Sequence, residues 1–591
     1  MYPPISDYGF ISNGDANALV SRVASIDWCC LPRADSASVF GRLLDWDRGG
    51  FWHIAPAGDD FEISRRYVGG SLILATTFVS HGGCARVLDC MTEGAPELLR
   101  IVEGVRGEVE FALRLAPRFD YGDVRPWLRQ HGEHQWSAVG GNDALVVVGD
   151  APLDREQEHD LIAQFRTREG ERTRFAVRWY APETIDPNPP APPTRSTIDM
   201  RLQSTRAWWQ HRARETDAAA STQQSALVLM GLTNPKTGAV LAAATTSLPE
   251  QIGGERNWDY RFSWIRDSEF AVRSLAELGY DEEADAFRRF IERSAAGDVE
   301  SLRVLYGVEG QRRLEERTLD LEGYRKSAPV RVGNAAATQR QHDVFGYLLE
   351  LTWRWHRRGR SPDDDYWRFL TTVVDRAAAE WDSPDRGMWE IRGEPQHFVH
   401  SKAMCWVAVD RGLKLAERCL RHAPVRDWRH ARDEIRRAME RDGYDEERGI
   451  FVRAFGSSEL DSALLLLPAY DFVSYDDERM VRTVDAIARE LDDNGLLRRY
   501  DSADGIEGSE GAFVACSFWL AECYAQMGRA RDAASVFSRA AATANDLGLF
   551  AEEYDTNRRE LRGNFPQALT HLAHIRAAVA IEGSSGIAAR R

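Results

Sequence analysis

The sequence predicts a multidomain fold in which an N-terminal antiparallel β-sandwich is followed by an all-α domain. Short β-branched and aromatic runs recur up to about residue 180, and helical periodicity takes over from about residue 224. A proline-rich segment lies between the two regions. At 591 residues, the chain is also longer than a single typical domain. We therefore expect a sandwich domain at 1–180, a linker with a bridging helix at 181–223 and a helical domain at 224–591.

The composition is that of an ordinary globular protein with an acidic balance. Hydrophobic residues make up 43% of the chain, charged residues make up 28%, and the formal net charge is −17. This charge argues against nucleic acid and anionic membranes as partners, whereas a neutral substrate is compatible with it. The first residues, MYPPISDYGF, have neither a basic region nor an apolar stretch of signal length, so we expect a cytoplasmic protein.

The cysteines predict neither a disulfide scaffold nor a metal site. There are eight in the whole chain, too few for a disulfide-stabilised fold. Neither the adjacent pair Cys29 and Cys30 nor the pair Cys84 and Cys90 has the spacing of a zinc site. We expect no structural metal.

The β region consists of short strands separated by Gly, Asp and Asn turns. Examples are FWHIAP, SLILATTFVS, ALVVVGD and TRFAVRWYAP, with no long helical period between them. This regular spacing favours an antiparallel sandwich over alternating strands and helices. The segment at 25–45, SIDWCCLPRADSASVFGRLLD, is rich in Trp, Cys, Pro and Phe, so we expect it to pack against another part of the protein.

The linker is defined by six prolines in APETIDPNPPAPPTR, residues 181–195. Proline lacks an amide hydrogen and fixes φ, so this segment favours extended polyproline conformations and excludes a helix. The following run, STIDMRLQSTRAWWQHRARETD, predicts a helix that bridges the two domains.

The helical domain contains ten runs that predict amphipathic or buried helices, several of them ending in Gly as a left-handed C-cap requires. About 360 residues spread over about twelve helices would allow roughly thirty for each helix and its loop. A toroid of helical hairpins with functional loops at one end fits this arithmetic. The predicted helical runs begin at or near residues 266, 281, 341, 366, 400, 426, 478, 510, 530 and 565.

One alternative is a helical-repeat binding scaffold. The run CSFWLAECYAQMGRARDAASVFSRAAATA resembles a single tetratricopeptide-type hairpin. A true array would repeat similar residues at a fixed period of about 34, and we find no such repeat.

The run at 257–267, NWDYRFSWIRD, has the composition of a carbohydrate pocket. Four aromatic residues alternate with polar ones, and the run ends on the adjacent pair Arg266 and Asp267. Sugar rings pack their C–H faces on aromatic side chains, and their hydroxyl groups need charged or bidentate partners. The competing interpretation is a strand or turn that enters a core helix, with aromatic residues that only pack.

Hydrolysis of a neutral glycoside requires two carboxyl groups, one on each side of the bond. A surface carboxylate is the ordinary alternative for any single acid. The loop-borne acids beside aromatic or glycine residues are Glu390, Glu507, Glu510, Glu552 and Glu553.

Glu390 has the strongest local context among these acids. It directly follows Trp389 and lies between Gly387 and Gly393, where the backbone can approach a ligand. An indole face beside the carboxyl would desolvate it and raise its pKa, as proton donation requires. Glu552 and Glu553 are adjacent, so their side chains should point apart and only one should act.

Several separate motifs, in the same order, resemble glycoside hydrolase family 15, the inverting glucoamylase and trehalase family. The resemblance is to bacterial and archaeal members with an N-terminal β-sandwich, and it covers nearly the whole chain. It implies an (α/α)6 barrel for the helical domain. The matching segments are 25–45, NWDYRFSWIRD, 323–350, 388–412, EGSEGAFVACSFWL, AEEYD and GNFPQALTHL.

The resemblance also implies two catalytic roles. The family's general acid lies in a Trp-Glu segment, which falls here on Trp389 and Glu390. Its general base falls on Glu552 in AEEYD, with Glu553 as the neighbour most easily confused with it. Glu510 is kept as an alternative.

The remaining implied residues bind the substrate. Tyr260 would help to hold the catalytic water, Trp264 would form part of the wall, and Arg266 with Asp267 would grip the non-reducing glucose. Arg499 and Tyr500 resemble the family's further sugar-binding arginine and its adjoining tyrosine, although the loop that follows differs in length and composition.

These implications describe an inverting, exo-acting α-glucoside hydrolase that releases β-glucose. We expect a trehalase, because trehalose occurs inside cells and no signal peptide is visible. The alternative is an intracellular glucoamylase or oligosaccharide α-glucosidase acting on α-1,4 or α-1,6 bonds. Two carboxyl groups need neither a cofactor nor a metal. The sandwich is expected to lay a loop over the barrel mouth and to help form a dimer, with sugar binding as the other interpretation.

Overall fold

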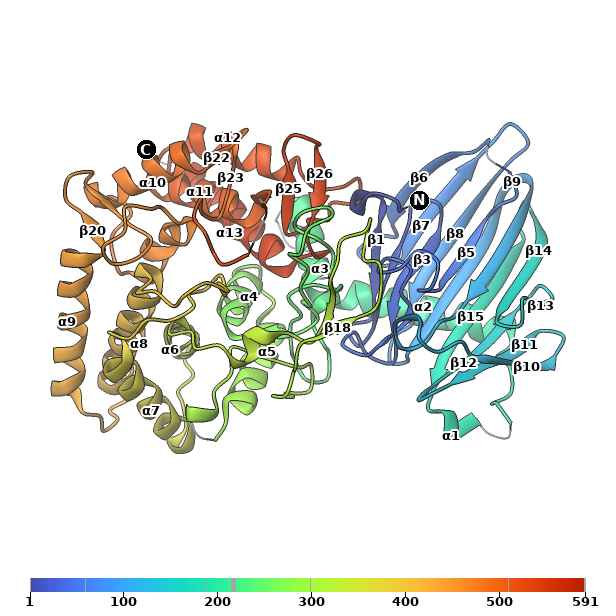
Figure 1. The fold of residues 1–591 in the computed structure, drawn as a ribbon. Coiled ribbons are helices and arrows are strands. Elements are labelled where there is room, and N and C mark those ends of the chain that lie inside the picture. Colours follow the sequence, from blue (N-terminus) through green and yellow to red (C-terminus); the bar gives the residue numbers. More distant parts are fainter. Residues whose placement is uncertain are drawn as a thin grey trace.

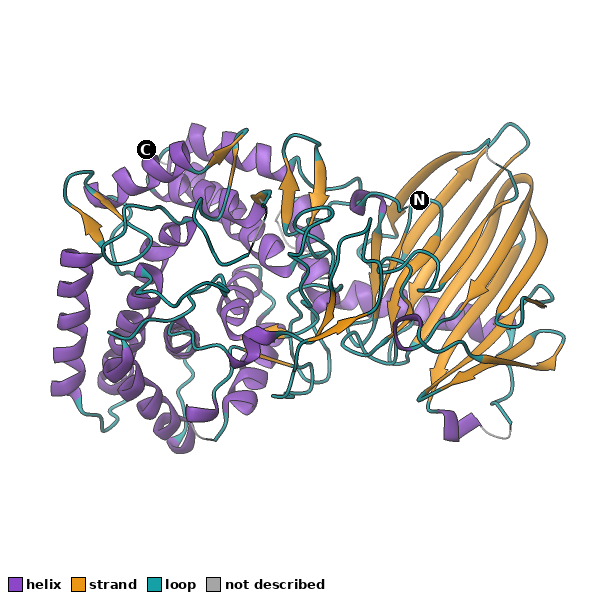
Figure 2. Ribbon diagram, viewed as in Figure 1, coloured by secondary structure: helices purple, strands orange, loops and turns teal. Residues whose placement is uncertain are grey.

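The computed structural model describes residues 2–588, apart from 59, 186–187, 214–218, 298, 507 and 509. A β domain and a helical domain lie side by side, the former on the right of Figure 1 and the latter on the left. The long strands lie in one domain and most helices in the other, with several short strands among the helices, as the colours of Figure 2 show. An antiparallel β domain followed by a helical domain is the predicted fold class.

The β domain is a sandwich whose two sheets share one long strand, β9 (Glu97–Ala116). The first half of β9 pairs with β8 (Gly83–Met91) and β15 (Arg172–Tyr180), and the second half pairs with β5 (Phe51–Pro56) and β14 (Asp160–Arg168). Gly104 lies where the strand passes from one sheet to the other, and a Cβ there would be 1.9 Å from the carbonyl oxygen of Arg168. Only glycine allows this approach.

All pairings within the sandwich strands are antiparallel, which confirms the predicted topology. One sheet has the order β1-β2-β3-β5-β9-β14-β13, with β4 beside β3, and the other has the order β6-β7-β8-β9-β15-β12-β11-β10. The remaining strands are β1 (Gly9–Ser12), β2 (Asn17–Val20), β3 (Ser25–Cys30), β4 (Ser38–Phe40), β6 (Glu62–Tyr67), β7 (Leu74–Val79), β10 (Trp127–Gly132), β11 (Gln135–Gly140), β12 (Asp143–Gly149) and β13 (Asp154–Glu156).

The proline-rich segment differs from the prediction at its start. Pro182–Ile185 form a single helical turn, α1, because proline is tolerated in the first turn of a helix, where its missing N–H would have no partner. The predicted bridging helix is α2 (Arg195–Arg212), and its side chains bind the sandwich. Asp199 accepts two hydrogen bonds from Arg174 of β15. Residues 214–217 of the predicted run lie outside the described residues.

The helical domain is a ring of inner helices surrounded by outer ones. Within the described residues, each inner helix packs on the next, and the last packs on the first. The inner ring is α4 (Ile265–Glu277), α6 (Asp343–Arg357), α8 (Val399–Arg418), η5 (Ser462–Tyr470), α11 (Val514–Gln526) and α13 (Ala568–Ala588). The outer helices are α3 (Ala220–Leu232), α5 (Asp281–Ala295), α7 (Asp364–Glu380), α9 (Val425–Asp442), α10 (Glu478–Glu490) and α12 (Ala530–Ala541).

The ten predicted helical runs correspond to α4 to α13, whereas α3 and η5 were not among them. The η5 segment reads SALLLLPAY, a continuous apolar run that has no 3.6-residue period and contains Pro468. It forms a 3₁₀ helix whose start is capped by Asp461, which accepts a hydrogen bond from the N–H of Ala463. A run without periodicity does not reveal a buried helix.

The predicted packing of segment 25–45 against another part of the protein is confirmed. The indole N–H of Trp28 donates to the carbonyl of Ala244 across the domain boundary (2.8 Å). The guanidinium of Arg261, in the run 257–267, donates to the carbonyl of Ser36 (2.7 Å) and to the hydroxyl of Tyr121 (2.8 Å). Arg261 also pairs with Asp259 beside it.

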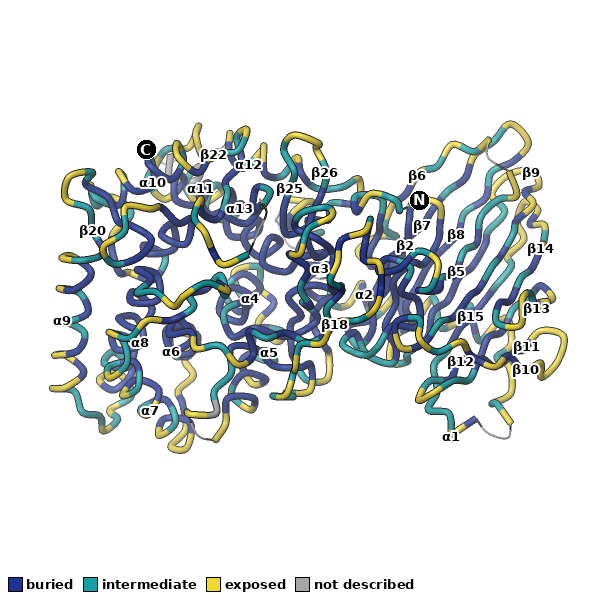
Figure 3. Tube along the Cα trace, viewed as in Figure 1, coloured by how far each residue is buried: buried dark blue, intermediate teal, exposed yellow. Residues whose placement is uncertain are grey.

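Burial follows this architecture. Buried positions fill the centre of the barrel, the inside of the sandwich and the boundary between the domains, and exposed positions gather on outer helices and strand ends (Figure 3). Among the described residues, no helix is both long enough and apolar enough to cross a membrane.

Replacing Arg261 tests the importance of the domain boundary. Arg261→Ala removes a fully buried cation and leaves Asp259 without its partner, so we expect a loss of about 3–5 kcal/mol in unfolding free energy. Thermal unfolding measures it. Arg441→Ala is the matched control, because Arg441 is exposed and, among the residues that the structure describes, pairs only with its neighbour Asp442. Equal unfolding temperatures for the two variants would contradict the expectation.

Candidate active site

The N-terminal ends of the inner helices share one end of the barrel, and the chain there carries the predicted site residues. Arg266 and Asp267 lie in the first turn of α4, and Glu390 lies in the connection that leads to α8. Arg499 precedes α11, and Glu552 lies in the connection that leads to α13. Helix N-termini carry partial positive charge, so this end of the barrel favours carboxylates.

Glu390 and Glu552 line the same cavity, although 162 positions separate them in the sequence. The inner cavity, as we call it, therefore brings together most of the predicted residues. Its other predicted lining residues are Tyr260, Trp264, Arg266, Asp267, Trp389 and Arg499.

Glu390 is held in an unusual backbone conformation. Its φ is +62°, in the left-handed region, which costs a residue with a Cβ roughly 1–2 kcal/mol. Its carboxyl accepts a hydrogen bond from the indole N–H of Trp264 (2.6 Å) and lies 3.5 Å from the guanidinium of Arg266. Burial raises the pKa of Glu390, and the charge of Arg266 opposes that rise. Backbone strain at such a position is typical of functional sites.

Glu552 has a different set of partners. Its Oε1 accepts a hydrogen bond from the hydroxyl of Tyr260 (2.8 Å), and only 1% of the residue is exposed. Burial raises the pKa of Glu552 to about 7, against the opposing charge of Arg499 and the hydrogen bond from Tyr260. A carboxyl with a pKa near neutrality is well matched to general base catalysis.

Two neighbouring aromatic residues thus hold the two carboxyl groups. The rings of Tyr260 and Trp264 lie edge to face with their centroids 5.5 Å apart, and each donates to one carboxyl. Burial raises the pKa of Glu390, the expected direction, but the indole N–H that binds its carboxyl lowers that pKa rather than raising it. The indole that binds Glu390 is that of Trp264, whereas Trp389 donates its N–H to Asp461 (2.8 Å) and lines the cavity wall.

Arginine side chains provide the positive charge of the inner cavity. Arg266 pairs with Asp267 (3.1 Å), and burial raises the pKa of that carboxyl. Arg499 lies among carboxylates, 2.6 Å from Glu510 and 3.2 Å from Glu250. These groups can donate to and accept from the hydroxyl groups of a sugar.

The predicted alternatives Glu553, Glu510 and Tyr500 do not line the inner cavity. Glu553 is fully buried, does not line the inner cavity, and accepts a hydrogen bond from the N–H of Gly511 (2.8 Å), so the two adjacent acids do point apart. Glu510 binds Arg256 and Arg499. Tyr500 donates to Asp504 (2.9 Å). Glu507 lies outside the described residues.

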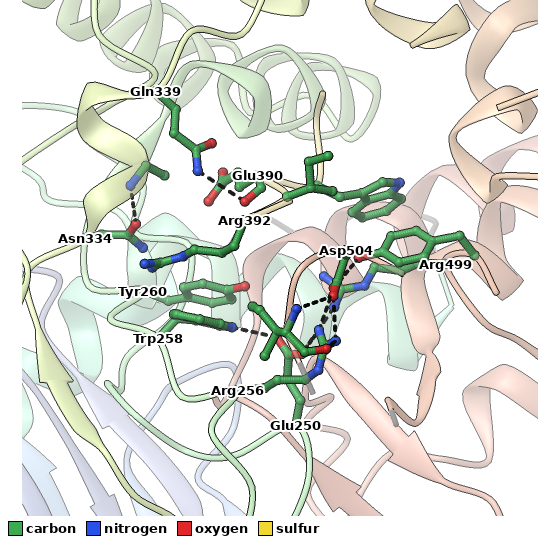
Figure 4. A pocket seen from close by; sticks show the side chains of 15 residues that line it. Glu250, Arg256, Trp258, Tyr260, Asn334, Gln339, Glu390, Arg392, Arg499 and Asp504 are labelled. Carbon is green, nitrogen blue, oxygen red and sulfur yellow. Dashed lines mark hydrogen bonds and ion pairs between the residues drawn. The ribbon is translucent and has the colours of Figure 1, made fainter. Parts of the chain in front are cut away.

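A second cavity adjoins the inner one, and we call it the outer cavity. Glu390, Tyr260, Trp389 and Arg499 line both cavities, whereas Glu552 lines only the inner one. Figure 4 shows Gln339 beside Glu390, and Trp258 pointing toward Glu250. The lining residues that were not singled out in the sequence are Glu250, Arg256, Asn334, Ala336, Gln339, Ile391, Arg392, Asp504 and Ile506.

Glu250 is the most informative residue that sequence reasoning missed. It accepts a hydrogen bond from the indole N–H of Trp258 (3.0 Å), and it pairs with Arg499. Burial raises its pKa to about 8, together with the nearby charge of Glu552. Its position in SLPEQIGGERNWDY, just before the aromatic run, was the only available signal.

The carboxylates around Arg499 have the spacing of a cation site. Within the described part of the chain, Glu250, Glu510 and Glu553 each place an oxygen within 4.8 Å of the others. Two guanidinium groups already supply positive charge to this cluster, since Arg256 and Arg499 both form ion pairs with Glu510. The arrangement therefore fits an ion-pair network with arginine as its cation.

The lining residues of both cavities fall between 242 and 569. No described residue of the sandwich is among them, so the loop expected over the barrel mouth does not form part of either cavity wall in the described part of the chain. The sandwich instead contacts the segment that forms the cavity wall, because Arg261 is adjacent to Tyr260 and bonds to Ser36.

Family models match both domains. The model described as glycosyl hydrolases family 15 matches residues 218–579, and the model described as trehalase-like, N-terminal matches residues 1–152.

Similar proteins match along nearly the whole chain. "Trehalase" of Mycobacterium tuberculosis is 39% identical over 98% of this chain and 89% of its own length. "Trehalase" of Mycolicibacterium smegmatis is 40% identical over 98% of this chain and 91% of its own length. "Trehalase" of Thermoplasma volcanium is 34% identical over 98% of this chain and 94% of its own length.

A solved structure has the same fold. The structure of a bacterial glucoamylase complexed with acarbose superposes with a TM-score of 0.71 at 11% identity, covering 100% of this chain and 96% of the glucoamylase chain. The helical domain is therefore a glucoamylase-like (α/α)6 barrel. The family model matches nearly all of the helical domain, and relatives more than 30% identical match along nearly the whole chain. This protein therefore belongs to glycosyl hydrolases family 15.

Proposed function

We propose that this glycoside hydrolase is a trehalase, which hydrolyses α,α-trehalose to two glucose molecules with inversion at the attacked carbon. Its full-length relatives are named trehalases. The observation that carries the proposal is the arrangement of two adjoining cavities. Glu390 lines both of them, and Glu552 lines only the inner one. A disaccharide can therefore place one ring in each cavity, with its bridging oxygen at Glu390.

In this mechanism, the inner cavity holds the glucose that is attacked. Arg266 and Asp267 bind its hydroxyl groups, and Trp389 and Trp264 provide apolar faces. The outer cavity holds the leaving glucose, where Trp258 provides an aromatic face and Asn334 and Gln339 provide amide groups.

The reaction is a single displacement. Glu390 gives its proton to the bridging oxygen while the bond from that oxygen to the attacked carbon breaks. Glu552, held by Tyr260, takes a proton from water as the water oxygen attacks the same carbon from the opposite face. The attacked ring becomes β-glucose, whereas the leaving ring keeps its own C–O bond and stays α.

The product anomers test substrate and stereochemistry together. Purified protein is incubated separately with trehalose, maltose, isomaltose and maltotetraose, and the early products are followed by proton NMR. We expect trehalose to be the best substrate and to give α- and β-glucose in equal amounts before mutarotation. Formation of α-glucose alone would indicate retention and would overturn the mechanism. A strong preference for maltose or maltotetraose would instead support a glucoamylase or α-glucosidase.

Substitution of the two acids tests their roles. Glu390→Gln should reduce kcat for trehalose by about 10²–10⁴-fold but should affect α-glucosyl fluoride much less, because fluoride leaves with little protonation. Glu552→Ala should lose activity on both substrates, since both need an activated water. If Glu553→Ala were inactive and Glu552→Ala active, the base would be Glu553.

The pH dependence tests the protonation state of the base. Burial raises the pKa of Glu552 to about 7, so this carboxyl becomes protonated and unable to accept a proton as pH falls below 7. We expect kcat/KM for α-glucosyl fluoride to fall about tenfold for each pH unit below that value. An activity that stays constant down to pH 5 would show that a group of lower pKa is the base.

A further inference from the structure

The turn that carries Glu390 rests on a second turn, at 504–505. The carbonyl oxygen of Asp504 accepts hydrogen bonds from the backbone N–H groups of Arg392 (3.0 Å) and Gly393 (2.6 Å). Gly505 has a φ of +90°, and a Cβ on it would lie 2.4 Å from the backbone nitrogen of Gly393. The two backbones are therefore in direct contact.

The side chain of Asp504 connects this contact to a third segment. Its two carboxylate oxygens accept hydrogen bonds from the two terminal nitrogens of Arg256, at 2.7 and 2.8 Å, in a bidentate pair. The hydroxyl of Tyr500 also donates to this carboxylate. The Arg256 and Asp504 side chains are 6% and 5% exposed, so solvent screens the pair little.

The link from the Glu390 turn through Asp504 to Arg256 matters for the position of Glu390, because the backbone of Glu390 is not in a relaxed conformation. Its left-handed backbone has to be held in place by neighbouring groups. The hydrogen bonds that do so include the amide of Gln339, which donates to the carbonyl of Glu390 (3.2 Å), and the two bonds to Asp504 just after it. Asp504 and Arg256 also line the outer cavity, as Figure 4 shows.

We infer that the Arg256–Asp504 ion pair is a positioning element for proton donation: it holds the Glu390 turn where the acid reaches the leaving-group oxygen. The inference rests on the proposed role of Glu390. Neither Arg256 nor Asp504 transfers a proton itself. Because the pair acts by holding the acid in place, its contribution is largest for substrates whose leaving group must be protonated.

The test measures substrate selectivity as well as activity. Asp504→Asn preserves the shape of the side chain but removes its charge and the bidentate pair with Arg256. We expect kcat/KM for trehalose to fall about 10–100-fold, with less than about a threefold change for α-glucosyl fluoride. Asp501→Asn is the matched control, because Asp501 lies in the same loop, is exposed and pairs only with Arg498 among the described residues. It should behave like the wild type.

A second variant reaches the same contact without changing any charge. Gly505→Ala places a methyl group against Gly393, so it should separate the two turns and produce the same selective loss. Because α-glucosyl fluoride hydrolysis still needs Glu552 and Tyr260, activity on it also reports that a variant is folded. Equal losses on both substrates, or no loss with either variant, would overturn the inference.

Aryl α-glucosides separate this inference from the choice of trehalose. Across a series of phenols, the positioning role predicts a steeper dependence of log kcat on leaving-group pKa for Asp504→Asn than for the wild type. An unchanged slope would overturn the role of Asp504 even if trehalose were the substrate. Failure of the wild type to hydrolyse trehalose, with a steeper slope in the variant, would contradict the proposed function alone.

Discussion

The candidate site depends on two hydrogen bonds that come from one short segment. Tyr260 donates to Glu552, and Trp264 donates to Glu390, so residues four positions apart orient two carboxyl groups that lie far apart in the sequence. Glu552 is buried and Glu390 is half-buried, and a carboxyl withdrawn from water without partners would not remain in a defined position or charge state. The geometry of the cavity therefore depends on how firmly the run 257–267 is held.

The sandwich domain contributes to that support. Arg261 lies between Tyr260 and Trp264 in the sequence, and its guanidinium is buried against Ser36 and Tyr121 of the β domain. The C-terminal end of the run 257–267 is held by the barrel, because Trp264 directly precedes the first turn of α4. The sandwich, none of whose described residues lines either cavity, thus helps to fix the backbone that carries the partners of both acids. This arrangement explains why the segment combines cavity residues with a fully buried cation.

The charge network behind Glu552 provides a second constraint. Glu250, Glu510 and Glu553 surround Arg499, and Arg256 adds a second cation. Burial is the chief cause that raises the pKa values of Glu250, Glu552 and Glu553, and the neighbouring carboxyl groups, which outnumber the buried guanidinium groups, raise them further. Under the proposed function, this coupling tunes the base toward neutral pH, and removing any member would shift the others.

The sequence by itself determined the order of the domains, ten of the helical segments and the residues of the aromatic run, because periodicity and residue type are local properties. Local context singled out Glu390 and Glu552 among several loop-borne acids, and the family resemblance assigned them the roles of general acid and general base. Only the tertiary structure decided that Trp264, rather than the adjacent Trp389, binds Glu390, since the indole that donates to its carboxyl comes from another part of the chain. It likewise revealed η5, whose buried apolar run has no period, and Glu250, Arg256 and Asp504, whose ordinary sequence contexts give no sign that they share one network. Long-range contacts of this kind arise from closure of the inner ring, which no local pattern encodes.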